Sequence, residues 1–463
     1  MTDLVDIDLT SSLAIHVIGI GGAGMSAIAT VLSTMGHRVS GSDLKESTGL
    51  ERLRAIGIDV RVGHDRSNVC DVDLVAVSTA IGERNPEIRA AVERNIPVLR
   101  RADVLRAITA VRKTLAVAGT HGKTTTSSML ALVLIEAGRQ PSFIIGGDVN
   151  EIGSGAAWDD GELFVVEADE SDGTFVELHR RGAIVTNLEA DHLEHYGDFD
   201  TLRKAFRRFL AETDGPTVVY GDDPLARHAA EGLGAVTYGT APDSNYRMLD
   251  VVSERAGVRF DLEHDGVALG TIQLPVPGAH NAQNAAGAVA LAMEVGVEFD
   301  AAERALARFG GVARRYEFRG ERAGVTFVDD YAHLPTEVDA ALDAARSGAW
   351  DRVVAVFQPH RYSRTQALWA DFADSFTNAD LVVITDVYAS GEAPRPGVSG
   401  KLVAYAILDE HPWARVAYVP RRSDVVNYLR AELRPGDLCL TLGAGDLTSL
   451  PDELIAGFDP GPQ

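Results

Sequence analysis

Short apolar runs alternate with longer stretches of helical periodicity along most of the chain. Near the N-terminus the apolar runs cover residues 14–20, 37–43, 73–79 and 96–100, and helical patterns follow Gly22 and span about 85–93. Buried strands that alternate with amphipathic helices are typical of a parallel sheet covered by helices. The pattern therefore predicts a Rossmann-like α/β domain, to which we assign residues 1–108.

The same alternation returns in two further blocks, and a chain of 463 residues is long enough for three domains. The second block has apolar runs at 114–119, 163–169 and 183–189, helical patterns at 123–134, about 201–213 and from near 280, and a β-rich antiparallel pattern at 247–275. It predicts a central phosphate-loop type ATPase domain with a mixed sheet in residues 109–312. The third has apolar runs at 324–330, 352–359, 379–387, 414–420 and 437–446. It predicts a C-terminal Rossmann-like α/β domain in residues 313–463.

Composition and charge narrow the class of protein. The formal charge of −24 argues against nucleic acid as a partner, because phosphate binding needs a basic face. Cys70 and Cys439 are the only cysteines, which excludes a disulfide framework. The acidic N-terminus does not resemble a signal peptide, and no run of about eighteen apolar residues predicts membrane insertion. We expect a cytoplasmic protein, and the sequence leaves a monomer–dimer equilibrium open.

A glycine motif ends the first apolar run. The spacing G-x-G-x-x-G places backbone N–H groups and a helix N-terminus where they can face a pyrophosphate. Asp43 follows the next predicted strand. The motif alone favours a nicotinamide-dependent dehydrogenase, although only weakly. Its glycines are Gly19, Gly21, Gly22 and Gly24.

The strongest local motif is AVAGTHGKTTT, residues 116–126, between an apolar strand and a helix. Glycines there let backbone N–H groups approach phosphate oxygens, Lys123 supplies a positive charge, and the Thr124 hydroxyl can reach Mg²⁺. The motif is not a full Walker A sequence, since Val117 stands where the first glycine would be. We expect ATP and Mg²⁺ to bind here. The residues of this phosphate loop are Gly119, Thr120, His121, Gly122, Lys123, Thr124 and Thr125.

Two acidic turns follow apolar strands of the central block. Carboxylates at the carboxyl ends of parallel strands are suitable ligands for Mg²⁺. The first of these two turns contains Glu167, Asp169, Glu170 and Asp172, and the second contains Asp191, His192 and His195. Further along, Asn281 and Asn284 lie one turn apart at a predicted helix start, where they either read a base edge or simply cap the helix.

Polar residues also follow two strands of the third block. The doubly wound topology presents its ligand-binding edge at these strand ends. Two arginines three residues apart suit a carboxylate or phosphate. The residues are Asp329, Asp330, Tyr331 and His333 after one strand, and His360, Arg361 and Arg364 after the other.

Together these motifs resemble, in order and over essentially the whole chain, those of the Mur ligases. The segments are HVIGIGGAGMSAIA, GTHGKTTT, EADESD, NLEADHLEHYG, HNAQNAAGA, DDYAHLPTE, FQPHRYSRT, TDVYASGEAPRPGVSGK and GAGD. The resemblance is strongest to the alanine-adding branch. It implies an ATP-dependent ligase of peptidoglycan precursor synthesis, which joins L-alanine to the lactyl carboxylate of UDP-N-acetylmuramate through an acyl phosphate.

The resemblance also implies residue roles. The glycine motif would hold the diphosphate of a UDP-sugar instead of a dinucleotide, with Asp43, Ser78 and Thr79 in the same site. The phosphate loop, Asn281, Asn284, Arg315 and Asp330 would bind ATP, and Thr124, Glu167 and His192 would bind magnesium. Tyr331, His333, His360, Arg361 and Arg364 would surround the amino acid and the muramate end. Lys123, His333, Arg361 and Arg364 are the candidate catalytic residues.

The chain departs from the family pattern at Leu334, where a second histidine is common, and we assign no role to this position. Besides the alanine-adding ligase, three interpretations stay open: a ligase that attaches a recycled tripeptide to the same sugar nucleotide, a protein that binds nucleotide without catalysis and, remotely, a nicotinamide-dependent dehydrogenase. In the family, ATP is held by two domains and the sugar nucleotide by a third, so closure of the domains is expected to assemble the site.

Overall fold

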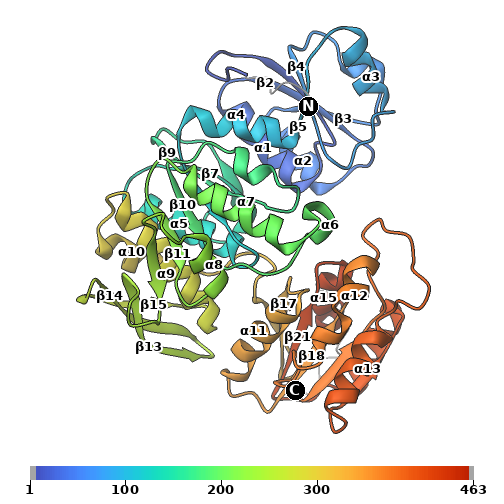
Figure 1. The fold of residues 1–463 in the computed structure, drawn as a ribbon. Coiled ribbons are helices and arrows are strands. Elements are labelled where there is room, and N and C mark those ends of the chain that lie inside the picture. Colours follow the sequence, from blue (N-terminus) through green and yellow to red (C-terminus); the bar gives the residue numbers. More distant parts are fainter. Residues whose placement is uncertain (1–6, 458–463) are drawn as a thin grey trace. The chain divides into compact units, whose positions relative to one another are not determined.

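The computed structural model describes residues 7–457, whose strands form three sheets (Figure 1). The first sheet is parallel, with the strand order β3-β2-β1-β4-β5. Its strands are β1 (Ala14–Ile18), β2 (Arg38–Asp43), β3 (Asp59–Val62), β4 (Leu74–Val77) and β5 (Val98–Arg100). Its helices are α1 (Ala23–Thr34), α2 (Thr48–Ala55), α3 (Pro86–Glu93) and α4 (Arg101–Val111).

Local sequence explains where these elements begin. Every residue of β1 is buried, as expected for a central parallel strand. The Ser47 hydroxyl accepts a hydrogen bond from the N–H of Leu50 and caps α2. Asn85 caps α3 in the same way, and Pro86 occupies the first helical position, where its missing N–H costs nothing.

The second sheet has the order β15-β14-β13-β12-β11-β10-β6-β9-β7-β8. Strands β6 to β12 pair in parallel, except that β7 pairs with β8 in the antiparallel sense. The strands are β6 (Lys113–Ala118), β7 (Ser142–Val149), β8 (Ser154–Ala157), β9 (Leu163–Glu167), β10 (Gly182–Val185), β11 (Thr217–Tyr220), β12 (Val236–Gly239), β13 (Tyr246–Glu254), β14 (Gly257–His264) and β15 (Val267–Leu274). The helices are α5 (Lys123–Glu136), α6 (Leu193–Tyr196), α7 (Phe199–Ala211), α8 (Pro224–Ala229), α9 (Ala279–Glu294) and α10 (Phe299–Leu306).

The third sheet has the order β16-β17-β21-β18-β19-β20 and is parallel except for its edge pair β16–β17. Its strands are β16 (Glu317–Arg322), β17 (Val325–Asp330), β18 (Arg352–Phe357), β19 (Leu381–Ile384), β20 (Val416–Tyr418) and β21 (Asp437–Leu442). Its helices are α11 (Pro335–Arg346), α12 (Tyr362–Leu368), α13 (Lys401–Glu410), α14 (Arg422–Glu432) and α15 (Leu450–Gly457). Separate apolar clusters pack on the two faces of this sheet.

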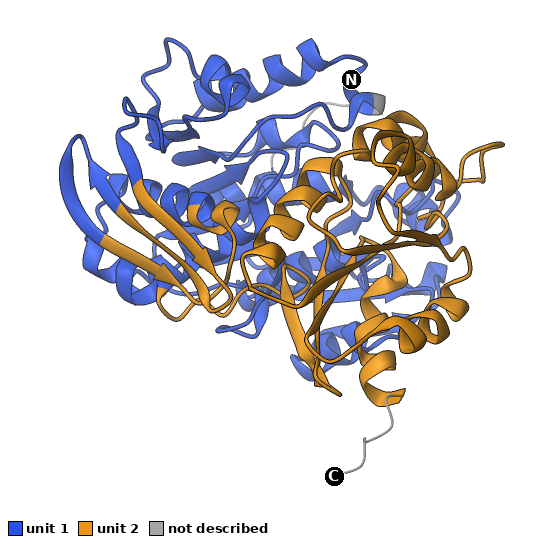
Figure 2. Ribbon diagram, turned by 90° about the horizontal axis from the view of Figure 1, so that it is seen from below, with its two compact units in different colours: residues 1–248, 262–270, 283–306 blue, residues 249–261, 271–282, 307–463 orange. Residues whose placement is uncertain are grey.

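The chain divides into two compact units (Figure 2). One unit comprises residues 1–248, 262–270 and 283–306, and contains the first sheet together with β6 to β12. An apolar cluster that extends from Leu9 to Ala230 runs through it. The other unit comprises residues 249–261, 271–282 and 307–463, and contains the third sheet.

The expected three-domain α/β fold is confirmed, with one sheet in each domain. The boundaries at 108 and 312 stay predictions. The sequence pattern did not indicate β3, β7, β8, β11, β12 or β16, most of which are short or lie near a sheet edge. Within residues 7–457, no helix combines the length and apolar character that a membrane span requires.

Candidate active site

The phosphate loop lies between the buried strand β6 and α5. Its glycines are needed for their backbone shape, because Gly119 and Gly122 have φ angles of +135° and +78°. A Cβ at Gly119 would collide with the Thr186 hydroxyl, and one at Gly122 with the Asn284 side chain. The turn is fixed by Asn187, whose carbonyl accepts the N–H of Thr120 at 3.1 Å. The turns that follow β6 and β10 thus meet α9 at this loop.

Lys123 is held by three acceptors of the protein. Its Nζ donates to the carbonyl oxygens of Gly119 at 2.6 Å and Thr120 at 3.2 Å, and to Glu170 Oε1 at 2.9 Å. Burial by itself would lower the pKa of Lys123, but the carboxylates of Glu170, Asp169 and Glu167 outweigh it and raise that pKa. The lysine is therefore charged at neutral pH.

Thr124 and Glu167 form the part of the predicted magnesium site that the structure brings together. The Thr124 hydroxyl donates to Glu167 Oε1 at 3.1 Å, and Glu167 Oε2 accepts the N–H of Gly146 at 2.7 Å. Among the side chains that the structure describes, no group of three or more His, Cys, Asp and Glu is arranged for a metal. A hydroxyl and one carboxylate nevertheless fit Mg²⁺, which uses few protein ligands and takes the rest from phosphate and water.

His192, the third predicted magnesium ligand, lies beside Glu170, the carboxylate that also accepts a hydrogen bond from Lys123. Its Nε2 lies 3.9 Å from Glu170 Oε1 and 3.3 Å from Asp191 Oδ2. His192 has a φ of +55°, an uncommon backbone conformation for a non-glycine residue. Such outliers are frequent at functional sites.

Of the other predicted ATP residues in the central domain, His121 and Thr125 belong to the loop segment, and Asn284 contacts the first turns of α5. His121 Nε2 is 3.2 Å from Glu189 Oε2, and Thr125 is buried in the first turn of α5. Asn284 Oδ1 accepts a hydrogen bond from the Thr126 hydroxyl at 3.2 Å. Asn281, one turn earlier on α9, donates from Nδ2 to the Pro277 carbonyl at 2.6 Å.

The glycine motif of the first sheet turns from β1 into α1. The Gly19 N–H donates to the Ser42 carbonyl at 2.8 Å, and the Gly21 N–H donates to Asp43 Oδ2 at 2.9 Å. Gly22 caps α1 and Gly24 lies in its first turn, whose N–H groups have no acceptor within the helix. An anion would therefore meet the positive end of α1.

Ser78 and Thr79 follow β4, the strand next to β1 in the first sheet. The Ser78 N–H donates to the Ile18 carbonyl at 3.1 Å, which fixes this turn beside the glycine motif. Ser78 is half-buried and Thr79 is exposed. A Cβ at Gly19 would approach Ser78 Cβ to 3.1 Å, so glycine allows the two turns to lie in contact.

The residues predicted in the third block lie at the carboxyl ends of β17 and β18, the two strands that flank β21 in the sheet. Asp330 accepts the N–H groups of Tyr316 and Ala332, both at 2.7 Å. Desolvation raises the pKa of Asp330 to about 6, although the nearby Arg315 guanidinium acts in the opposite direction. That guanidinium also lies 5.0 Å from the centre of the Tyr331 ring.

Aromatic rings and arginines form the rest of this edge. The His333 ring makes edge contacts with Tyr331 at 5.4 Å and with His360 at 5.7 Å. His333 Nδ1 lies 3.2 Å from Glu337 Oε2. Burial lowers the pKa of His333, so its imidazole is neutral at pH 7.

The two arginines differ in backbone setting. Arg364 lies in α12, and its Nη1 is 3.2 Å from His360 Nδ1. Arg361 precedes α12 with φ of +67° and ψ of 137°, a strained conformation that the hydrogen bond from its N–H to the Tyr388 carbonyl helps to hold. Its Nε is buried and has no hydrogen-bond partner among the described residues.

Sequence reasoning gave no individual role to Glu170, Asn187 or Tyr388. Glu170 is one of several acidic residues in its turn, and the sequence does not single it out as the ionic partner of Lys123. Tyr388 stacks on His360 at 5.8 Å from within the segment TDVYASGEAPRPGVSGK. Leu334, at the departure from the family pattern, is buried where α11 begins.

Models of one family match all three domains. The model described as "Mur ligase family, catalytic domain" matches residues 14–113, "Mur ligase middle domain" residues 117–292, and "Mur ligase, glutamate ligase domain" residues 314–445. A UDP-N-acetylmuramate–L-alanine ligase of Desulforamulus reducens is 46% identical over 449 residues, which are 95% of this chain and 97% of that protein. The chain belongs to the Mur ligase family.

Solved structures of Mur ligases are similar to this fold. The UDP-N-acetylmuramate–alanine ligase of Thermotoga maritima gives a TM-score of 0.81 at 30% identity and covers 96% of this chain and 98% of that one. A murein peptide ligase of Psychrobacter arcticus gives 0.70 at 23% identity, again over 96% and 98% of the two chains, and shows the fold alone. For this Mur ligase, neither a dehydrogenase nor a tripeptide-ligase activity is favoured.

Proposed function

We propose that this Mur ligase joins L-alanine to the lactyl carboxylate of UDP-N-acetylmuramate and converts ATP to ADP and phosphate. Similarity over nearly the full length to alanine-adding relatives supports the choice of substrates. The observation that carries the chemistry is the meeting of Lys123, Thr124 and Glu167 at the phosphate loop. We assign UDP-sugar binding to residues 1–108, ATP binding to 109–312 and amino-acid binding to 313–463.

Phosphoryl transfer comes first in the proposed reaction. A carboxylate is a poor electrophile, so the lactyl carboxylate attacks the γ-phosphorus of ATP and becomes an acyl phosphate, while ADP leaves. Lys123 lies at the loop that would hold the β- and γ-phosphates and offsets the charge on the transferring oxygens. The amine of L-alanine then attacks the acyl carbon, and phosphate leaves from the tetrahedral intermediate.

Thr124, Glu167 and His192 are the residues that we propose for Mg²⁺. The ion, when bound, neutralises phosphate charge and helps to orient the γ-phosphoryl group. Asn281 and Asn284 are proposed to contact adenine, and Arg315 and Asp330 to contact ATP from the C-terminal domain.

We assign recognition of L-alanine to side chains that follow strands β17 and β18 of the third sheet. Arg361 and Arg364 would hold the amino-acid carboxylate, since guanidinium groups match carboxylate geometry. The neutral His333 imidazole is suited to accept the proton that the incoming ammonium must lose before it attacks. Tyr331 and His360 would enclose the amino acid and the muramate end.

Recognition of the UDP-sugar is assigned to the first sheet. Gly19, Gly21, Gly22 and Gly24 would bring the start of α1 to the diphosphate, with Asp43, Ser78 and Thr79 beside it. We place the reaction in the cytoplasm, because Cys70 and Cys439 are both free thiols, as is usual in a reducing compartment.

Phosphate release tests this function. We expect release from ATP and Mg²⁺ only when UDP-N-acetylmuramate and L-alanine are both present. Turnover with a tripeptide and none with L-alanine would favour the recycling ligase instead. Absence of turnover with either acceptor, from protein shown to be folded, would contradict the ligase assignment.

A further inference from the structure

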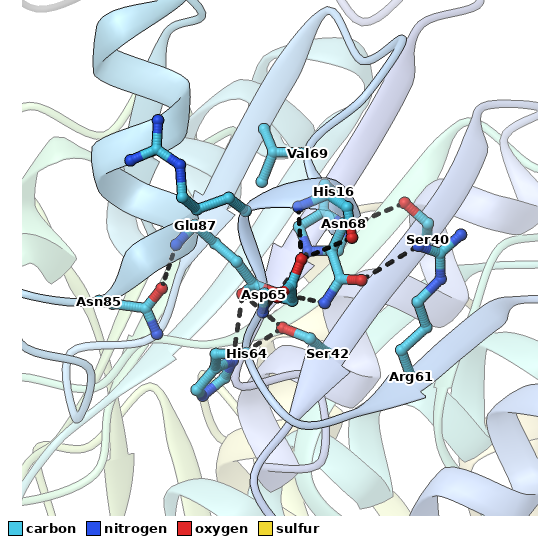
Figure 3. Close-up of polar contacts among 12 residues, drawn as sticks. His16, Ser40, Ser42, Arg61, His64, Asp65, Asn68, Val69, Asn85 and Glu87 are labelled. Atoms are coloured by element: carbon cyan, nitrogen blue, oxygen red, sulfur yellow. Dashed lines mark hydrogen bonds and ion pairs between the residues drawn. The ribbon is translucent and has the colours of Figure 1, made fainter.

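A buried carboxylate of the first domain lies outside the residues assigned to ATP, the amino acid and the UDP-sugar. Glu87 is in the first turn of α3 and its side chain is 0% exposed. Its Oε2 accepts the Ser42 hydroxyl at 2.6 Å and lies 3.0 Å from His64 Nδ1, while its Oε1 accepts the Asn68 Nδ2–H at 2.6 Å and the Asp65 N–H at 3.3 Å (Figure 3). One carboxylate thus connects two segments that are distant in sequence.

The carboxylate of Glu87 is charged. Burial would raise its pKa, but the side chains of His16, Ser42 and Asn68 outweigh this effect and lower the pKa to about 2. His16, on β1, places Nε2 3.7 Å from Glu87 Oε1. A buried charge is stable only while such partners surround it, so the segments that carry them are held in fixed positions.

Ser42 connects this carboxylate to the glycine motif. Its side chain is bound to Glu87, and its carbonyl accepts the N–H groups of Gly19 at 2.8 Å and Ile20 at 3.1 Å. The next residue, Asp43, accepts the Gly21 N–H through its carboxylate. Ser42 is 0% exposed, so it acts on the motif through the backbone and does not reach a ligand itself.

A second set of hydrogen bonds connects Glu87 to Asp43 through the segment that follows β3. The chain after β3 contributes Gly63, whose N–H donates to the Asp43 carbonyl at 2.7 Å and whose carbonyl accepts from Asn68 Nδ2 at 3.3 Å. Asn68 belongs to the short 3₁₀ helix Arg66–Asn68, and its Nδ2 also donates to Glu87. Glu87 therefore fixes the backbone on both sides of Asp43.

We propose that Glu87 is a positioning residue for the UDP-sugar: it sets the carboxyl ends of β2 and β3, and through them Asp43 and the glycine motif. This inference rests on the proposed function, which assigns the UDP-sugar to that motif. The proposal adds Glu87 to the UDP-sugar site as a residue that acts on the glycine motif through its hydrogen bonds with Ser42 and Asn68.

Steady-state kinetics and equilibrium binding on the full chain test the proposal with Glu87→Gln. The amide keeps the size of the side chain but replaces one acceptor oxygen with a donor, which then faces the donors of Ser42 and His64 or of Asn68 and Asp65. We expect KM and Kd for UDP-N-acetylmuramate to rise about tenfold, with kcat and the KM values for ATP and L-alanine changed less than about twofold.

Glu93→Gln is the matched control. Glu93 lies on the same helix and forms an exposed ion pair with Arg66, so its loss should leave all of these constants unchanged. Unchanged UDP-N-acetylmuramate constants in a folded Glu87→Gln protein would overturn the proposal. Equal changes in all three KM values would also overturn it, because they would indicate a general structural role.

Ser42→Ala decides the question if Glu87→Gln does not fold. It removes only the hydroxyl that links the carboxylate to β2, and we expect a rise of about threefold, confined to UDP-N-acetylmuramate. No rise would overturn the proposal. Measurements on the wild-type protein distinguish failure of this inference from failure of the proposed function. If the wild type neither binds UDP-N-acetylmuramate nor releases phosphate from ATP in its presence, the proposed function itself is contradicted.

Discussion

At the scale of single residues, the pair Lys123–Glu170 makes a prediction about stability. Both side chains are largely buried, so Glu170→Gln leaves the ammonium without its ionic partner. We expect the free energy of unfolding to fall by about 3 kcal/mol. We also expect Mg²⁺ and a non-hydrolysable ATP analogue to raise the melting temperature more in the variant, because the phosphates then provide a missing counter-charge instead of replacing an existing one.

The matched variant is Glu162→Gln. Glu162 pairs with Lys113 at 2.7 Å, but both side chains are more than half exposed. Solvent screens ion pairs between exposed side chains, and they contribute little to stability, so this variant should unfold like the wild type. Thermal unfolding with and without nucleotide distinguishes the two cases. An equal shift of melting temperature on nucleotide binding in wild type and Glu170→Gln would contradict the role given to Glu170.

His360 makes a prediction about pH. Burial, with His333, Arg364 and Arg361 nearby, lowers the pKa of His360 to about 3, whereas an unfolded histidine titrates near 6.5. The unfolded state therefore binds the proton first, and the stability contributed by neutral His360 is lost as pH falls from about 6.5 towards 3. Urea unfolding at pH 7 and pH 5 should show a smaller loss for His360→Gln than for wild type. Equal losses would contradict this assignment.

At the scale of elements, the turn between β6 and α5 depends on glycine. In Gly119→Ala the new Cβ meets Thr186, and φ of +135° is unfavourable for alanine, so the loop must move. We expect affinity for an ATP analogue to fall by about tenfold or more, as measured by titration calorimetry. The control is Gly138→Ala, which has positive φ but open space around its Cβ. It should lower stability by about 1 kcal/mol and leave nucleotide affinity unchanged.

At the scale of the whole molecule, the proposed ATP ligands belong to both compact units. Lys123 and Thr124 lie in one unit, and Arg315 and Asp330 in the other. Under the proposed function we expect ATP to restrict the motion of the units, which would shield the acyl phosphate from water. Small-angle scattering should give a smaller radius of gyration with UDP-N-acetylmuramate and an ATP analogue. Identical curves with and without these ligands would contradict the expectation.

The order of the elements was largely predictable from hydrophobic patterning. The strands with continuous apolar runs, such as β1, β6, β18 and β21, are the central strands, because burial on both faces removes polar alternation. Short strands near sheet edges carry too few apolar residues to be distinguished from loops, and β8, with the sequence SGAA, is an example. The segment 317–322, polar in sequence, becomes β16 only because it pairs with β17.

Those parts of the candidate site whose residues lie within one short segment of sequence could be predicted. The phosphate loop and the pair Arg361 and Arg364 are each contained in one short segment, so spacing and the rule of strand carboxyl ends were enough to select them. The roles assigned to these residues stay predictions until they are measured. Glu170 could not be selected from its acidic neighbours, because its partner Lys123 is 47 residues away and only the sheet order brings them together.

The sequence by itself determined the apolar central strands, and which short motifs carry phosphate and carboxylate chemistry, because periodicity and glycine spacing are local properties of the chain. Only the tertiary structure decided which polar side chains share a site. It brought Glu87 to Ser42 over 45 residues and Asn284 to Thr126 over 158 residues. Partners at such separations are chosen by strand order and packing, which depend on many residues at once and leave no pattern in any single segment.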